Sequence, residues 1–304
     1  MNKIIHLITI ILMISACSNA KKSVELSEME KWKLGWRMIA SNWEGNYTLG
    51  ETQFDSLLIQ SDRDIELKFL ITGLEILSHL DKKEKLLEIL EHQDQEVLQE
   101  ICIRDLFTQK LNDVDVCKSI AKEKVGNPEL QMELIRMYVD DQAARGNLME
   151  DIIQKYSLDK TEVSNEDGVT VDAKNRQRLK VIFNEFGFPT RSMVGKDAMH
   201  GVFLMIQHSD GDKDWQKAQL RNIEQAVKNG DLDGQSYAYL YDRININAGQ
   251  KQRYGTQFSN VDPLNNIVEL ADTEEIGSLD QRRMEIGMMP IDMYKELMLK
   301  NLKN

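Results

Sequence analysis

The sequence predicts an all-α protein, in which a repeat-like N-terminal stack of helical hairpins leads into a C-terminal helical domain with polar loops. Two observations predict this class. The 304 residues include only 4 prolines and 17 glycines, the residues least favourable inside helices. Apolar side chains also recur at intervals of three and four residues over long stretches, as on one face of a helix.

The N-terminal elements follow from this periodicity. Residues 28–43 predict a helix with aromatic side chains on one face, and residues 62–125 predict successive amphipathic helices. Polar breaks fall at 81–83, 92–94 and 112–113. Short helices joined by tight turns indicate a stack of the tetratricopeptide or HEAT kind, although no clean repeat period is visible.

The C-terminal elements alternate with polar segments. Residues 157–171 predict a loop, and short extended pieces are possible near 257–270. The predicted helices are 128–146, 172–186, 194–208, 212–229, 232–247, 273–286 and 290–302.

The N-terminus has the features of a secretory signal. Lys3 supplies a positive charge, and the apolar run 4–14 is far shorter than the roughly twenty residues of a membrane-spanning helix. The sequence Ile-Ser-Ala then precedes Cys17. This arrangement resembles the lipobox of bacterial lipoproteins, with Ile14 at a position often held by Leu.

The lipobox resemblance implies cleavage before Cys17, a diacylglycerol on its thiol and acylation of its new amine. Several acyl chains make membrane anchoring stable, since each buried methylene contributes about 0.8 kcal/mol. Ser18 replaces the Asp that retains such proteins in the inner membrane. We therefore expect an outer-membrane protein that faces the periplasm, with 1–16 as signal peptide and 17–27 as tether.

Charge and motif content exclude several functions. The net charge of −12 argues against a nucleic-acid partner, which would require a basic face. The chain lacks the P-loop, HExxH and GxSxG patterns. His200 and His208 are about two helical turns apart, too far to share one ion without help, so neither a metal nor another cofactor is predicted.

Cys102 and Cys117 are the cysteines other than Cys17. An oxidising compartment would allow them to pair across a helix–turn–helix. Two buried thiols on helical faces are the alternative, and the sequence leaves both possibilities open.

Polar motifs gather in the second half of the chain. They are DQxxR (Asp141, Gln142, Arg145), a Gly-Phe-Pro turn at 187–189, QHxD (His208, Asp210), YLxDR (Asp242, Arg243), GxxQxYGTQ (Gln252, Tyr254, Thr256, Gln257) and DxRRxxxG (Arg282, Arg283). This order resembles a bacterial domain family of unknown function. Phe188 replaces the Trp that is usual in the turn. The resemblance implies a shared domain without naming an activity.

His208 is the candidate acid or base. It follows an apolar helix, so partial burial is expected, and both ring nitrogens then need partners. Asp210, Asp242 or a backbone carbonyl could orient the ring. A hydrogen-bonded histidine at a helix end, without function, is the alternative.

The other motif residues are candidate ligand contacts. Asp141 and Arg145 lie one turn apart and could pair locally on the surface. Arg282 and Arg283 could clamp a carboxylate or phosphate, or cap neighbouring helices. The remaining candidates are Gln142, Arg243, Gln252, Tyr254, Thr256 and Gln257, which offer hydrogen bonds near glycine hinges.

Two functions fit these features. The first is a lipoprotein module that binds a polar ligand or a protein partner of the cell envelope. The second is a hydrolase-like enzyme on an envelope substrate, with His208 as acid or base. In either case 28–125 is the predicted N-terminal helical region and 126–304 the C-terminal helical domain.

Overall fold

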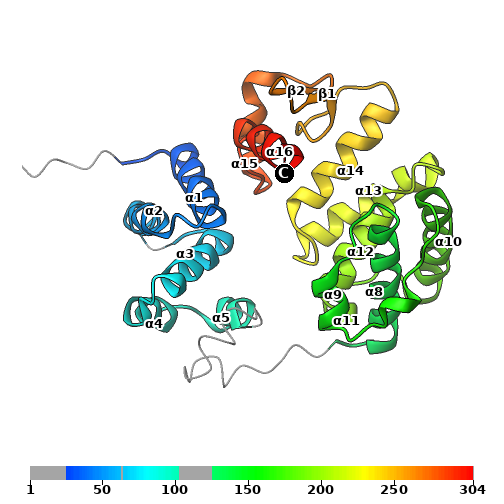
Figure 1. Ribbon diagram of the computed structural model, residues 1–304, viewed down its shortest axis with the longest axis horizontal. Helices are drawn as coiled ribbons and strands as arrows, with labels where there is room; N and C mark the ends of the chain where they lie inside the picture. The colour runs from blue at the N-terminus through cyan, green and yellow to red at the C-terminus, as the bar shows by residue number, and fades with distance from the viewer. Residues whose placement is uncertain (1–24, 63, 103–124, 304) are drawn as a thin grey trace, which may run out of the picture.

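The computed structural model describes residues 25–62, 64–102 and 125–303, which are mainly helical (Figure 1). Within these ranges the strands form one small two-stranded sheet. The all-α class predicted from the sequence is therefore confirmed. Cys17, Cys117 and the predicted break at 112–113 lie outside the described residues. No helix in the described ranges has the length and apolar content needed to cross a membrane.

The N-terminal helices pack as a stack on one side of the molecule (Figure 1). Their shared core contains Trp36, Phe54, Phe69 and Leu77, all buried. Cys102 is also buried, at the end of the last helix of the stack. The helices are α1 (Glu28–Trp43), α2 (Tyr47–Gln60), α3 (Leu67–His79), α4 (Lys83–Glu91) and α5 (Gln95–Cys102).

Side-chain caps mark the start of the first two helices in this stack, whereas α3 and α4 begin without one. Ser27 and Glu30 form a reciprocal capping box at the start of α1. Asn46 caps α2 without a reciprocal bond, since its side-chain oxygen accepts from the backbone N–H of Leu49. The apolar pattern predicted no helix at α2, because its buried side chains are few, with Phe54 and Leu57 the only apolar ones.

The C-terminal part begins with a second group of helices, on the opposite side of Figure 1. Leu134, Leu179, Val202, Ile206 and Leu240 lie in its core. The helices are α8 (Pro128–Ala143), α9 (Glu150–Lys155), η1 (Lys160–Glu162), α10 (Gly168–Phe186), α11 (Arg191–Val194), α12 (Lys196–Gln207), α13 (Lys213–Lys228) and α14 (Gly234–Asn247).

Two predicted boundaries in this group were wrong. The helix predicted over 194–208 is present as α12 but begins only at Lys196, because the φ of +81° at Gly195 is incompatible with a helix. The loop predicted over 157–171 contains the 3-10 helix η1 and the start of α10. Asp167 explains the earlier start, because its side chain accepts from the backbone N–H of Thr170.

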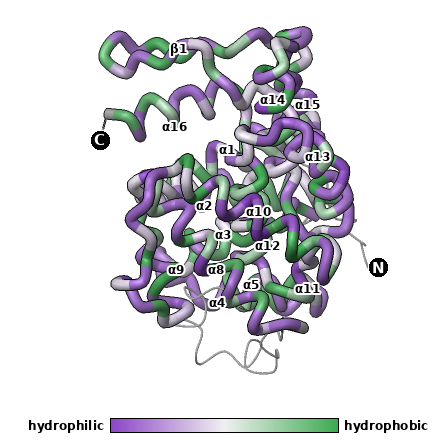
Figure 2. The backbone as a smooth tube through the Cα atoms, turned by 90° about the vertical axis from the view of Figure 1, so that its right-hand side faces the viewer, coloured by the Kyte–Doolittle hydropathy of each residue, from purple (hydrophilic) through white to green (hydrophobic). Residues whose placement is uncertain are grey.

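After α14 the chain forms a hairpin and returns toward the N-terminal stack. Strands β1 (Phe258–Asp262) and β2 (Ile267–Leu270) pair antiparallel, with a register shift between Phe258 and Asn260. The short helix η2 (Ile276–Ser278) then leads into α15 (Leu279–Glu285) and α16 (Ile291–Lys303). Figure 2 shows α16 beneath the hairpin. The extended pieces predicted near 257–270 are present, and the helix predicted over 273–286 is shorter than expected.

The C-terminal helices are fixed to the N-terminal stack by specific contacts. The indole Nε1 of Trp32 donates to the carbonyl of Met288 at 3.0 Å. The ammonium of Lys68 donates to the carbonyl of Gly287 at 3.1 Å. Lys33 also pairs with Asp280 at 3.1 Å. Met289 is also buried in the core of the N-terminal stack, so elements from the two ends of the chain share one core.

Candidate functional site

The candidate site is built on the close packing of α8 against α12. Gly201 of α12 faces Tyr138 of α8, and a Cβ added at Gly201 would lie 2.6 Å from the Cβ of Tyr138. The missing side chain therefore lets the two helices approach. This approach brings Asp141, near the end of α8, next to His208, the residue that ends α12.

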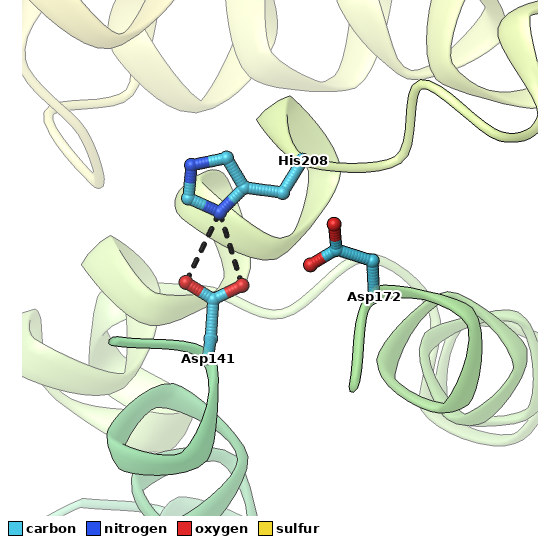
Figure 3. A group of neighbouring side chains, drawn as sticks. All are labelled: Asp141, Asp172 and His208. Carbon is cyan, nitrogen blue, oxygen red and sulfur yellow. Dashed lines mark hydrogen bonds and ion pairs between the residues drawn. The ribbon is translucent and has the colours of Figure 1, made fainter. Parts of the chain in front are cut away.

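Asp141 and His208 form a hydrogen-bonded pair (Figure 3). The Nδ1 atom of His208 lies 3.0 Å from each carboxylate oxygen of Asp141. Asp141 is fully buried, whereas 14% of the His208 side chain is exposed. The second ring nitrogen, Nε2, points away from Asp141 and has no hydrogen bond within the described part of the chain. The pair thus leaves Nε2 available to a ligand.

The DQxxR motif holds the buried carboxylate from its other sides. Gln142 donates to Asp141 Oδ2 at 2.9 Å, and Arg145 lies 3.4 Å from Asp141 Oδ1. Arg145 also donates to Asp172, on α10, at 2.6 Å. The local pair between Asp141 and Arg145 is therefore present. Its description as a solvated surface contact was wrong, because Asp141 is completely buried.

Asp210 pairs with Arg243 and not with His208, which corrects one predicted partner. Arg243 Nε lies 3.1 Å from both carboxylate oxygens, and Gln216 and Asn247 also donate to Oδ1. Burial alone would raise the pKa of Asp210, but the hydrogen bonds from Arg243 and Gln216 hold it below its ordinary value. Asp210 therefore keeps Arg243 in place.

Asp172 adds a third acidic group to the His208 environment (Figure 3). Single ligand atoms of Asp141, Asp172 and His208 lie within 4.8 Å of one another, a spacing that a metal ion would accept. However, Arg145 already contacts both carboxylates, and Nδ1 already faces Asp141. A cation here would have to displace the guanidinium, so this donor set is better matched to Arg145.

Asp242 lies in a different environment from its neighbour Arg243. It is fully buried and accepts from the backbone N–H groups of Arg253, Tyr254 and Thr256 at 2.7–3.1 Å. The Thr256 hydroxyl donates to it as well, at 3.0 Å. Burial raises the pKa of Asp242 despite these bonds. Asp242 is therefore not the orienting partner of His208; it fixes the loop that follows α14.

The glutamines of this loop also bond to protein atoms. Gln252 is fully buried, and its amide nitrogen donates to the carbonyls of Gln257 and Ala271 at 2.8 and 3.1 Å. Its side-chain oxygen accepts from the backbone N–H of Gln257 at 2.8 Å. Gln257 donates to Thr256 Oγ1 at 3.0 Å. These side chains hold the loop closed, which accounts for their polarity without a ligand.

Arg282 and Arg283 bond to backbone carbonyls. Arg282 Nε donates to the carbonyl of Arg253 at 2.7 Å. Arg283 is fully buried and donates to the carbonyls of Met289 and Tyr254, both at 2.6 Å. Burial lowers the pKa of Arg283. Of the two predicted roles, these contacts match the structural one, in which the arginines tie neighbouring segments together.

The predicted residues therefore separate into two groups. The first group, named here the His208 cluster, consists of residues connected to His208 directly or through Asp141 or Asp210: Asp141, Gln142, Arg145, His208, Asp210 and Arg243. Asp242, Gln252, Tyr254, Thr256, Gln257, Arg282 and Arg283 form a buried network around the loop. Sequence reasoning missed Asp172, Gln216 and Asn247, since no motif contains them.

Several cavities in the described ranges lie away from the His208 cluster. One of about 440 Å³ lies between the N-terminal stack and the second group of helices, and is lined by Leu67, Glu100, Tyr138 and His200, among others. Another of about 600 Å³ lies between α2 and α4. The His208 cluster is instead a partly exposed group of charges at the ends of several helices.

The fold and the site together define an all-α protein with a charged cluster around one histidine. Residues 128–302 match a family of unknown function, DUF6624. The match covers more than half of the chain, so the chain belongs to this family. It confirms that the C-terminal part is a domain of unknown function. No curated protein and no solved structure matches the chain.

Proposed function

We propose that the His208 cluster is the active site of a hydrolase-like enzyme, in which His208 transfers a proton to or from a bound polar substrate. The observation that carries the proposal is the 3.0 Å contact of Nδ1 with a fully buried carboxylate. A carboxylate in that position fixes the ring and selects the tautomer with the proton on Nδ1. The lone pair on Nε2 is then free to accept a proton.

Water is the nucleophile in this proposal. The hydroxyl nearest to His208 in sequence belongs to Ser209, which is fully buried and donates to the carbonyl of Met205 at 2.8 Å. It therefore caps α12 and cannot reach a substrate. Nε2 of His208 would take a proton from water and return it to the leaving group, as general acid–base catalysis requires.

Arg243 supplies a fixed positive charge, linked to His208 through Asp210, whose carboxylate interacts electrostatically with the histidine. Its side chain is 29% exposed, and Asp210 holds it through Nε and Nη2. A guanidinium fixed in this way can stabilise negative charge that develops on a substrate oxygen without losing side-chain entropy at that moment. The exposed part of Arg243 and the free Nε2 of His208 together form the reactive surface.

The test compares wild type with His208→Gln, using the full chain purified in detergent. Cell-envelope extracts incubated with each protein are compared by mass spectrometry. We expect products that form with wild type and not with His208→Gln. His92→Gln, at an exposed histidine of the N-terminal stack, is the matched control. Identical product profiles for wild type and His208→Gln would overturn the enzymatic proposal.

A thermal-shift assay added to this experiment separates catalysis from binding alone. A binding module would retain an envelope molecule without converting it, so the molecule would raise the melting temperature of the protein while its own mass stayed unchanged. An enzyme would instead convert it. The polar-ligand or partner-binding function stays the alternative interpretation of this surface.

The cellular location is part of the proposal and rests on the sequence before residue 18. Cleavage before Cys17 and lipidation of that residue would place the protein at the outer membrane, facing the periplasm. An envelope molecule would then be the substrate. Mass analysis of the mature N-terminal peptide tests the anchor: we expect a lipid-modified cysteine, which Cys17→Ser should abolish. An unmodified or uncleaved N-terminus in wild type would contradict it.

A further inference from the structure

Arg176 lies beside the His208 cluster. It follows Asp172 by four residues on α10, so the two side chains share one face of the helix. A carboxylate oxygen of Asp172 in turn lies within 4.8 Å of one carboxylate oxygen of Asp141 and one ring nitrogen of His208. From the opposite direction, Gly211 follows His208 by only three residues and approaches the Arg176 guanidinium.

The guanidinium of Arg176 has uncommitted donors, unlike the other arginines nearby. Arg145 and Arg243 are both paired with carboxylates. For Arg176, which is partly buried, no hydrogen bond or ion pair is found among residues 25–62, 64–102 and 125–303. Its charge acts on Asp212 at longer range, but Asp212 already accepts from Lys180 at 2.8 Å.

We infer that Arg176 binds an oxyanion group, a phosphate or a carboxylate, of the substrate on which His208 acts. The inference rests on the proposed function and specifies the substrate class. A guanidinium presents parallel N–H donors that match two oxygens of such a group. Asp172 and Asp212, the carboxylates related to Arg176, already pair with Arg145 and Lys180, so an incoming anion need not displace either of them.

Gly211 keeps one face of this guanidinium open. A Cβ at Gly211 would lie 3.2 Å from Nη1 and 3.4 Å from Nη2 of Arg176, tighter than ordinary van der Waals contact. Gly211 is not among the glycines with positive φ, so alanine there adds a methyl group without backbone strain. Gly211→Ala therefore obstructs the guanidinium while the charge remains.

The test measures binding of inorganic phosphate and of acetate to the full chain in detergent by isothermal titration calorimetry. Arg176→Ala should weaken binding of the preferred anion about tenfold or more, as expected for a charge-assisted hydrogen bond. Gly211→Ala should weaken it in the same direction. Arg178→Ala and Gly277→Ala are the matched controls. Arg178 lies on the same helix but pairs with Glu133, and a Cβ at Gly277 would meet open space.

The preferred anion identifies the source: stronger phosphate binding indicates a phosphorylated substrate, and stronger acetate binding a carboxylated one. The inference is overturned if neither anion binds the wild type, or if binding survives Arg176→Ala unchanged. Calorimetry measures binding without turnover. Loss of anion binding in Arg176→Ala would therefore support the inference even if His208→Gln formed the same products as the wild type. The failure of the inference and that of the proposed function are thus distinguishable.

Discussion

Replacing Asp242 with alanine should destabilise the protein strongly, because this carboxylate organises the loop after α14. The substitution removes the acceptor of three backbone N–H groups and of the Thr256 hydroxyl. Asp242 and Thr256 are both buried, so water cannot readily replace the carboxylate. The perturbation therefore tests whether Asp242 is structural, as its contacts indicate.

The magnitude follows from two opposing effects. Each buried donor left without an acceptor costs about 1–3 kcal/mol. Against this, burial raises the pKa of Asp242, so removing the charge relieves part of its desolvation cost. Because several buried donors lose their acceptor at once, the cost of leaving them unpaired exceeds the gain from removing the buried charge. We expect a net loss of about 3–5 kcal/mol, as found when a buried charge loses its partner.

Urea unfolding of the full chain in detergent, followed by circular dichroism, measures this loss. The matched control is Asp262→Ala, since Asp262 also accepts from backbone N–H groups, of Leu264 and Asn265, but at the surface. The control should change the unfolding midpoint much less than Asp242→Ala. A shift in Asp242→Ala no larger than that of the control would refute the reasoning.

Two further predictions concern the frame of the site. Gly201→Ala should lower the free energy of unfolding by about 1–3 kcal/mol in the same assay, because its Cβ would lie 2.6 Å from that of Tyr138. Gly277→Ala is the control, since a Cβ there meets open space. Equal stability of the two variants would contradict the prediction, because α8 and α12 would then separate without cost. Asp210→Asn should lower stability at neutral pH, since Arg243 holds the folded-state pKa of Asp210 below its ordinary value of 3.8. Its contribution is present above that value and is lost as pH falls through the folded-state pKa. A wild-type-to-mutant difference that grows on acidification would contradict this sign.

The sequence predicts the helices well where apolar periodicity is strong and poorly where it is weak. The segments α10, α13 and α14 carry enough apolar residues to show a helical face. In α2 the buried face includes Gly50, which packs beside Ile76 and contributes no hydrophobic signal of its own. Helices of this kind depend on tertiary packing, which a local pattern does not reveal.

The sequence predicted the residues of the His208 cluster, but it did not predict which of them contact one another. The motifs contain His208, Asp141 and Arg243, but the partner of His208 lies 67 residues away on another helix. Asp242 and Arg243 are adjacent in one sequence motif. Consecutive helical residues are rotated by about 100°, so one faces the buried loop and the other faces Asp210.

The tautomer of His208 tests the central claim most directly, because the proposed chemistry requires a free lone pair on Nε2. Long-range proton–nitrogen NMR on the full chain in detergent, with the ring assigned by its absence in His208→Gln, reports which nitrogen carries the proton in the neutral imidazole. The contact with Asp141 predicts a protonated Nδ1 and an unprotonated Nε2. A proton on Nε2, with Nδ1 unprotonated, would contradict the account.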